Sequence, residues 1–187
     1  MSGENETLEA EVEAEPVEAI LDEDGLVKIL DERKTEIYNK GYYGCFEKGV
    51  LKLTPLEALL LLERGRIKVT DSDKNPIDFK QLVNFYLKKD QKIWTKYIVY
   101  RDLRSRGYTV GLGYEGEMDF RVYERGAVPN EDAAKYLVYV IEEGIPLALI
   151  NLEKIISIGA SSRKKTALAV VDRQGEPTYY FVSEVEL

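Results

Sequence analysis

The stretch DFRVYERGAVPNEDAAKYLV, residues Asp119 to Val138, indicates a strand, a loop and a second strand. Apolar and polar residues alternate in its first and last parts, which is typical of strands with one buried face. Further runs of period two lie on both sides: YTVGLGY before it, and TALAVVD and TYYFVSEVE after it. Residues 90–187 are therefore predicted to form a mixed sheet of about five strands.

Two helical segments flank these strands. QKIWTKYIVYRDLRSRG places apolar side chains on one helical face, and IPLALINLEKIISIGASS has a second apolar stripe. Because each helix must bury its stripe, we expect the sheet to pack against helices. The fold class is predicted to be α+β, with residues 90–187 as one domain.

Residues 17–89 combine a strand, GLVKILD, with three helical segments. ERKTEIYNKGYYG is predicted to be a short helix closed by Gly41. LTPLEALLLLERGRI has clear start and stop signals, and DFKQLVNFYLKK follows a turn at DSDKNPI. The signals are an N-cap, a proline at the first position, a capping box and a closing glycine: Thr54, Pro55, Glu57 and Gly65. These residues are predicted to form a small N-terminal α/β domain.

The charge is concentrated at one end of the chain. The net charge is -8, but ten of the 34 acidic residues lie in residues 1–24, which contain no lysine or arginine. The remaining 24 acidic and 26 basic residues give residues 25–187 a charge of +2. Residues 1–16 are predicted to be a disordered acidic tail.

Composition excludes several classes of protein. No apolar run approaches the roughly 20 residues that cross a bilayer, so a cytoplasmic protein is expected. The chain has no histidine and one cysteine, Cys45, which excludes an internal disulfide and a structural zinc site. No metal or cofactor is predicted, and Cys45 is expected to be buried or half-buried.

Three stretches in order carry a resemblance: YIVYRDLRSRGYTV, DFRVYERG and SSRKKTALAVVD, with KYLVYV between the last two. From about Lys92 to Val185 the chain resembles the C-terminal catalytic domain of the archaeal tRNA-splicing endonucleases, the tRNA-intron lyases. GYYGCFEKGVLKLTPLEALLLLERG fits the N-terminal domain of that family more loosely. The resemblance implies metal-free cleavage of precursor tRNA at bulge-helix-bulge junctions, leaving 2′,3′-cyclic phosphate and 5′-hydroxyl ends.

The same resemblance implies a catalytic triad of Tyr, His and Lys. The tyrosine position is Tyr123 and the lysine position is Lys164, whereas the histidine position holds Ala133. In such a reaction the phenol accepts the 2′-hydroxyl proton, the ammonium stabilises the phosphorane and an acid protonates the leaving 5′-oxygen. Without that acid, this chain alone is expected to be slow or inactive. Without the resemblance, Tyr123 would be a sheet-surface residue and Lys164 a solvated base.

Several explanations of the missing acid remain open. Glu131 and Asp132 lie nearby, but exposed loop carboxylates are ionised near neutral pH and have no proton to donate. Ser157 stands where the family often has a base-stacking arginine, and Ala160 where a second histidine is common. The chain is then either a natural non-catalytic subunit or a catalytic chain with a substituted active site. A purely structural scaffold and a general RNA-binding module are the alternatives.

The resemblance also implies precursor tRNA and like or related subunits as partners, in a homotetramer or heterotetramer. Tyr180 and Val182 belong to a C-terminal strand predicted at a sheet edge, where two subunits can pair. Asp172 and Glu176 match an acidic loop that the family inserts into an opposing dimer; a protected edge and a plain hairpin turn are the alternatives. The predicted RNA-contacting residues are all basic: Arg101, Arg104, Arg106, Arg121, Arg125, Arg163, Lys164 and Lys165.

Overall fold

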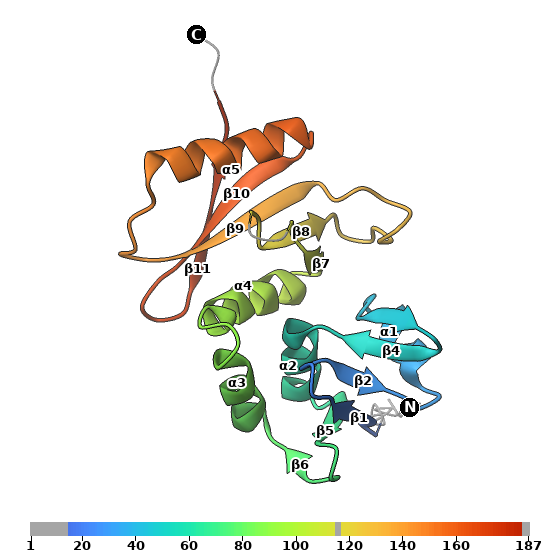
Figure 1. The fold of residues 1–187 in the computed structure, drawn as a ribbon. Coiled ribbons are helices and arrows are strands. Elements are labelled where there is room, and N and C mark those ends of the chain that lie inside the picture. Colours follow the sequence, from blue (N-terminus) through green and yellow to red (C-terminus); the bar gives the residue numbers. More distant parts are fainter. Residues whose placement is uncertain (1–14, 115–116, 185–187) are drawn as a thin grey trace, which may run out of the picture.

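The computed structural model describes residues 15–114 and 117–184. Their strands form two separate sheets, and the helix α4 (Ile93–Ser105) lies between the sheets and contacts elements of both halves (Figure 1). The first sheet lies within residues 17–77 and the second within residues 109–182. The predicted α+β fold class is thus confirmed. The predicted boundary at residue 89 remains a prediction.

The first sheet has six strands in the order β3-β4-β2-β1-β5-β6. All its neighbouring pairs are antiparallel except β1 and β5, which run parallel. The strands are β1 (Val17–Leu21), β2 (Val27–Ile29), β3 (Cys45–Glu47), β4 (Val50–Leu53), β5 (Ile67–Thr70) and β6 (Pro76–Ile77). Only β2 was predicted as a strand, because strands this short leave little periodic signal in the sequence.

Three helices accompany the first sheet: α1 (Lys34–Asn39), α2 (Pro55–Glu63) and α3 (Phe79–Leu87). Helix α2 is apolar on all sides and is buried, as expected for a helix enclosed by other elements. Its capping box is confirmed: the Thr54 side chain accepts from Glu57 N–H, and the Glu57 side chain accepts from Thr54 N–H. Gly65 follows with a φ of 63°, as predicted for the closing residue.

The second sheet has five strands in the order β11-β10-β9-β8-β7. Strands β9 and β10 run parallel, and the other neighbours are antiparallel. The strands are β7 (Thr109–Leu112), β8 (Phe120–Tyr123), β9 (Tyr136–Glu142), β10 (Lys165–Val171) and β11 (Pro177–Val182). The five predicted strands are confirmed, and β11 lies at an edge as expected.

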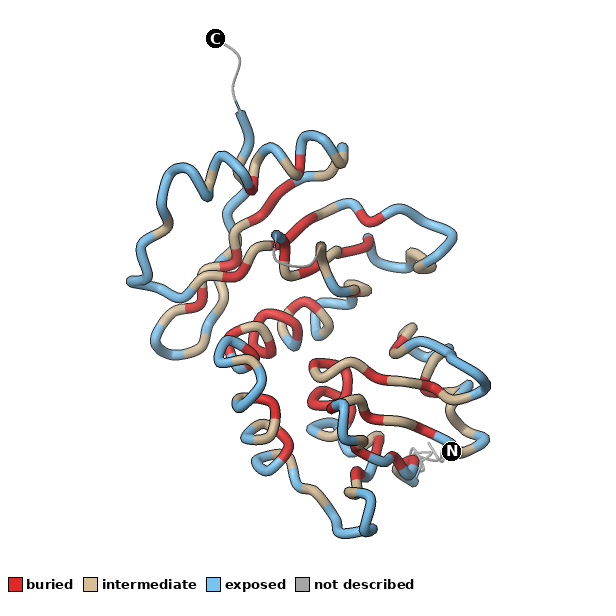
Figure 2. The backbone as a smooth tube through the Cα atoms, in the orientation of Figure 1, coloured by how far each residue is buried: buried red, intermediate tan, exposed pale blue. Residues whose placement is uncertain are grey.

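Each face of the second sheet is covered by one helix. Helix α4 packs on one face, and its buried side chains join the strands and the first half of the chain in one hydrophobic core. Helix α5 (Leu149–Ser161) packs on the other face through a smaller cluster around Leu137 and Ile155. Figure 2 shows α5 exposed along its outer side and α4 largely buried. Helix α4 thus links the two halves of the molecule.

Two local expectations are wrong. Gly41 does not close α1 with a positive φ; Tyr42 adopts it instead, at 55°, and its N–H bonds to Tyr38 O. Cys45 is exposed, because all three residues of β3 at the sheet edge are exposed. Residues 1–14 of the predicted acidic tail lie outside the described residues. Within the parts that are described, no helix is long and apolar enough to cross a membrane.

Candidate active site

Three adjacent strands of the second sheet end at the same place. Val122 of β8 is opposite Tyr136 of β9, and Tyr136 is opposite Lys165 of β10. One residue further toward this end, Tyr123 is the last residue of β8 and Lys164 directly precedes β10. Backbone hydrogen bonds hold the three ends together: Lys135 N donates to Val122 O at 3.0 Å, and Lys165 N donates to Lys135 O at 3.0 Å.

The same register places Tyr123 and Lys164 on one face of the sheet. Side chains alternate between faces along a strand, and the Val122 side of the sheet packs on α4. Tyr123 and Lys164 are each one residue from that row, so they belong to the α5 side. A phenol and an ammonium thus approach the same corner of the molecule from strands separated only by β9.

Tyr123 is largely buried, with 9% of its surface exposed. Its ring lies beside Gly111 on the neighbouring strand β7, where an added Cβ would be in ordinary van der Waals contact, 3.8 Å from Tyr123 Cε2. The ring is therefore supported by the sheet, and only a small part of it reaches solvent. A tyrosine held in this way has little rotational freedom to lose when a substrate binds.

Lys164 is positioned by the end of α5. The helix closes with two hydrogen bonds, from Arg163 N to Ala160 O at 3.0 Å and from Lys164 N to Gly159 O at 2.9 Å. Arg163 lies between them with a φ of 53°, a conformation that usually requires glycine. The Lys164 ammonium donates to Ser162 O at 3.1 Å and is half-buried. Its direction is set by the helix terminus rather than by an acidic partner.

Close packing of α5 on β10 supports this corner. Gly159 faces Thr166, and a Cβ added at Gly159 would lie only 1.8 Å from Thr166 Oγ1. Any larger residue at position 159 would push the helix terminus away from the strand. The position of Lys164 therefore depends on glycine at position 159, which has no side chain to clash with Thr166.

Ala133 lies in the loop between β8 and β9, and its methyl group is exposed. The loop is held by local hydrogen bonds: Asp132 Oδ2 accepts from Val128 N at 2.8 Å, and Asp132 N donates to Val128 O at 2.9 Å. Glu131 and Asp132 are both exposed. Neither lies in the buried surroundings that keep a carboxylic acid protonated at neutral pH.

Lys135 was not singled out from the sequence. It immediately precedes β9, lies between Tyr123 and Lys164 in the cross-strand row, and forms an ion pair with Glu124. The Glu124 carboxylate raises the pKa of Lys135. Its ammonium also lies 5.7 Å from the ring centroid of Tyr136, which packs on the α4 side of the sheet. Only the pairing of three strands reveals its place in this row, because nothing in the sequence near Lys135 distinguishes it from other surface lysines.

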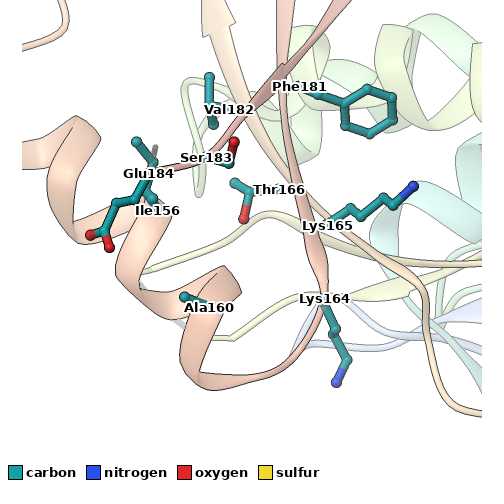
Figure 3. Close-up of a pocket in the computed structure, with 9 residues that line it drawn as sticks. All are labelled: Ile156, Ala160, Lys164, Lys165, Thr166, Phe181, Val182, Ser183 and Glu184. Atoms are coloured by element: carbon teal, nitrogen blue, oxygen red, sulfur yellow. The ribbon is translucent and has the colours of Figure 1, made fainter. Parts of the chain in front are cut away.

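A cavity of about 500 Å³ opens next to Lys164, between α5 and the strands β10 and β11 (Figure 3). Ala160, where a second histidine was expected by resemblance, lines it together with Thr166 and Glu184. Lys164, just before β10, and Lys165, its first residue, project in different directions (Figure 3). The walls carry few polar groups beyond the two lysines and Glu184, and the exposed Ser157 is not among the lining residues.

Four of the predicted RNA-contacting arginines make contacts within the chain. Arg101 pairs with Glu63 at 3.1 Å, and Arg106 pairs with Asp102 at 2.8 Å. Two others donate to backbone carbonyls: Arg121 to Leu112 O at 2.8 Å, and Arg104 to Gly41 O at 2.8 Å.

Arg104 also stacks on Tyr43, with 4.2 Å from Cζ to the ring centroid. It therefore joins α4 to the N-terminal half. The other three basic positions, Arg125, Arg163 and Lys165, are exposed and form no ion pair within the described parts of the chain.

The residues predicted for assembly lie along one edge of the molecule. Tyr180 is 55% exposed on the edge strand β11, and Val182 is half-buried. Asp172 closes the hairpin before β11, because its Oδ1 accepts from Gln174 N at 2.9 Å and Glu176 N at 2.8 Å. Its carboxylate is thus engaged within the turn, whereas Glu176 is exposed.

No metal centre can be assigned to the described residues. Among them, no group of three or more His, Cys, Asp or Glu side chains is placed to hold an ion. The side chains that the strand register brings to this corner are the phenol of Tyr123 and the ammonium of Lys164.

Comparisons with known proteins identify the family of both halves of the chain. Residues 17–83 match the family model of the tRNA intron endonuclease N-terminal domain, and residues 93–179 match that of the tRNA intron endonuclease catalytic C-terminal domain. A tRNA-splicing endonuclease of Thermococcus kodakarensis is 37% identical over 150 residues, which cover 80% of this chain and 87% of that protein.

Two further relatives extend the match. A tRNA-splicing endonuclease of Methanococcus maripaludis is 31% identical over 187 residues, covering 100% of this chain and 99% of that protein. One from Methanococcoides burtonii is 38% identical over 162 residues, covering 86% of this chain but 45% of that longer protein. Since both halves match in their natural order and full-length relatives exceed 30% identity, the chain belongs to the tRNA intron endonuclease family.

Proposed function

We propose that this chain is a subunit of a cytoplasmic tRNA-splicing endonuclease that cleaves precursor tRNA at bulge-helix-bulge junctions. The observation that supports this role is the placement of Tyr123 and Lys164 on one face and at one end of three paired strands. The family assignment supplies the substrate class. The role of each residue below rests on this placement and on the chemistry of its side chain.

The proposed reaction is an attack of the RNA on its own backbone. Tyr123 accepts the proton of the 2′-hydroxyl, and the 2′-oxygen forms a bond to the adjacent phosphorus. The Lys164 ammonium stabilises the extra negative charge of the phosphorane. The bond from phosphorus to the 5′-oxygen then breaks, which leaves a 2′,3′-cyclic phosphate and an oxygen that must take up a proton.

The proton for the leaving oxygen is the missing component. Ala133 presents a methyl group at the position where the family carries a histidine, and Glu131 and Asp132 are exposed loop residues. Loss of a positioned general acid typically lowers the rate by roughly 10²- to 10⁴-fold. We therefore propose that this chain by itself cleaves slowly or not at all.

Ser157 and Ala160 bear on the origin of this defect. A single engineered substitution accounts for Ala133, but not for two further departures from the family pattern. We propose a natural non-catalytic subunit that assembles with an active relative, in a tetramer whose subunits pair along β11. A catalytic chain with a substituted active site is the competing account.

The decisive experiment replaces Ala133 by histidine and measures cleavage of a bulge-helix-bulge RNA by the purified full chain. If the site is otherwise intact, we expect A133H to raise the rate by roughly 10²- to 10⁴-fold. Glu131→His is the matched control, because it places an imidazole in the same exposed loop without occupying position 133. Adding Tyr123→Phe to A133H should abolish the gain.

Two outcomes contradict parts of the proposal. Fast cleavage by the unaltered chain would show that another group supplies the proton. An inactive A133H chain that also fails to support cleavage when mixed with a catalytically competent relative would reject the endonuclease role. If A133H is inactive by itself but supports cleavage when mixed with a catalytically competent relative, the chain is the natural non-catalytic subunit.

A further inference from the structure

Residues 124–135 connect β8 to β9, although these two strands are adjacent and antiparallel. Such strands are usually joined by roughly two to five residues, so this connection is longer than strand pairing requires. Ala133 lies near its end and is exposed. Long loops on a rigid sheet commonly carry functional residues, so the length of this loop points to function.

Asp132 closes a ring over residues 128–132 of this loop. Its Oδ2 accepts from Val128 N at 2.8 Å, and its own N–H donates to Val128 O at 2.9 Å. Glu131 N donates to the same carbonyl at 3.1 Å. Asn130 has a φ of 82°, a left-handed conformation that asparagine adopts more readily than most residues. Asp132 thus engages both polar backbone groups of Val128.

A second anchor follows directly after residue 133. Ala134 is buried, with 8% of its surface exposed. Lys135 N donates to Val122 O at 3.0 Å, and Lys165 N donates to Lys135 O at 3.0 Å. Residue 133 is therefore held on both sides, by the closed ring before it and by the sheet after it.

The two ends of the loop are also joined to each other. The Glu124 carboxylate and the Lys135 ammonium form an ion pair, and Ala127 N donates to Glu124 O at 3.1 Å. An exposed ion pair contributes little stability by itself. The backbone at residue 133 is therefore fixed mainly by the ring that Asp132 closes and by the sheet.

Position 133 lies close to the candidate active site. Lys135 lies between Tyr123 and Lys164 in the cross-strand row. A chain advances by at most about 3.6 Å per residue, so the Cα of residue 133 is within about 7 Å of Lys135 in that row. The backbone at this point determines where a side chain at position 133 can lie. Misplacement of a reacting group by about 1 Å can lower a rate by roughly 10²-fold.

We propose that Asp132 is a positioning residue, which fixes the backbone at position 133 beside Tyr123 and Lys164. The chain then lacks the side chain of the acid but keeps the support for it. The inference rests on the proposed function, because it takes position 133 as the place of the acid. It gives the exposed Asp132 carboxylate a role other than proton donation.

The alternative is that the charge of Asp132, and not its hydrogen bond, acts on position 133. Asp132→Asn separates the two, because the amide oxygen can still accept from Val128 N while the charge is removed. Asp132→Ala removes both. Glu131→Gln is the matched control, since it removes the charge of the adjacent exposed carboxylate and leaves the bonds of the ring in place.

The first readout is NMR relaxation of the backbone N–H of residue 133 in the unaltered full chain. We expect an order parameter of about 0.85, the value of rigid backbone, and a value below about 0.6 in D132A. D132N and E131Q should keep the high value. This measurement needs no catalytic activity.

The second readout is cleavage of a bulge-helix-bulge RNA by A133H, whose imidazole is the only one in the chain. Adding D132A should lower kcat by roughly 10- to 100-fold, because the acid is no longer held in place. KM should change by less than about twofold, since the acid acts in the reaction step and not in binding. A133H combined with D132N or E131Q should cleave as A133H does.

Three results would overturn the proposal. One is equal order at residue 133 in the unaltered chain and in D132A. Another is a loss in D132N as large as that in D132A, since the charge would then be responsible. The third is an active A133H chain in which D132A leaves kcat unchanged, whether or not KM rises.

The two proposals can fail separately. If A133H never cleaves, alone or mixed with a catalytically competent relative, the endonuclease role fails, and the order at residue 133 alone decides the role of Asp132. If A133H cleaves and D132A alters neither kcat nor the order at residue 133, the positioning role fails and the endonuclease role stands.

Discussion

Single residues decide whether this corner of the sheet can perform chemistry. Tyr123 is fixed against the sheet, Lys164 is fixed by the end of α5, and Ala133 leaves an exposed methyl group in the adjoining loop. The backbone of Lys135 lies between them in the strand register, and its ammonium pairs with Glu124. A reaction that needs a base, an electrostatic stabiliser and an acid thus has clear candidates for only the first two.

Arg163 carries backbone strain next to Lys164. Its φ of 53° is costly for any residue with a Cβ, by roughly 1 kcal/mol relative to glycine. Arg163→Gly is therefore expected to raise the free energy of unfolding by about 0.5–1 kcal/mol, while removing one exposed charge. Denaturant unfolding would measure this gain.

Arg163→Ala is the control for that substitution, because it removes the guanidinium but keeps the strain. It should leave stability nearly unchanged. Equal stabilities of R163G and R163A would mean that the left-handed conformation costs nothing here.

Elements set the positions of these residues through a few close contacts. Helix α5 approaches β10 at Gly159, where Thr166 occupies the space of a side chain. Helix α2 begins with a reciprocal cap in which Glu57 is buried. Each contact joins one element to another, so a substitution that removes it also shifts the neighbouring element.

Gly159→Ala should destabilise the protein by about 1–3 kcal/mol, because its Cβ would overlap Thr166 Oγ1. Thr166→Ala removes that oxygen, so the double variant should recover part of the loss. Denaturant unfolding of both single variants and the double variant measures the coupling. Strictly additive effects would show that the two residues do not compete for the same space.

Glu57 is predicted to make stability depend on pH. Burial raises the pKa of its carboxyl. Hydrogen bonds donated by Gly44 N–H and Thr54 favour the charged form and offset only part of this effect. Because the pKa of Glu57 in the folded state lies above its unfolded value of 4.5, protonation of Glu57 favours the folded state. This stabilisation is fully present below the unfolded pKa and is lost as the pH rises through the folded pKa.

The difference in unfolding free energy between the unaltered chain and Glu57→Gln should thus be larger at pH 4.5 than at pH 7.5. Glu153→Gln, at an exposed position on α5, is the control and should show no such difference. If the difference in unfolding free energy between the two chains instead grew as the pH rises, the pKa of Glu57 would not be raised in the folded state.

Helix α4 is the element that joins the two halves of the molecule, because it packs on helices α2 and α3 as well as on the second sheet. Tyr97 of α4 donates to Glu63 of α2 at 2.7 Å, and Arg104 reaches Gly41 and Tyr43 in the N-terminal half. The same helix covers one face of the second sheet. The candidate site therefore rests on a C-terminal sheet that is joined to the N-terminal half.

Arg104→Ala is expected to lower the free energy of unfolding by about 1–3 kcal/mol, since it removes a half-buried hydrogen bond and a stacked ring contact. Arg173→Ala, in the exposed hairpin loop, should change stability by less than about 0.5 kcal/mol. Thermal or denaturant unfolding compares the two. A stable R104A chain with weakened RNA binding would instead favour the role predicted from sequence.

The sequence by itself determined the elements of the second half, the capped helix α2 and the family. These follow from local signals: alternating apolar residues, caps, glycines and motifs of a few residues in fixed order. It also proposed Tyr123, Lys164 and Ala133 as the positions of the triad, because each lies within such a motif, and these roles remain predictions. Five of the six short strands of the first sheet carried too little periodic signal to be found.

Only the tertiary structure decided which of these residues meet. Tyr123 and Lys164 are 41 positions apart in the printed sequence, and they approach each other because β9 pairs with both of their strands. The register position of Lys135 and the internal role of Arg104 emerge in the same way. Strand pairing and burial depend on contacts between distant segments, and no local pattern in the chain records which segments those will be.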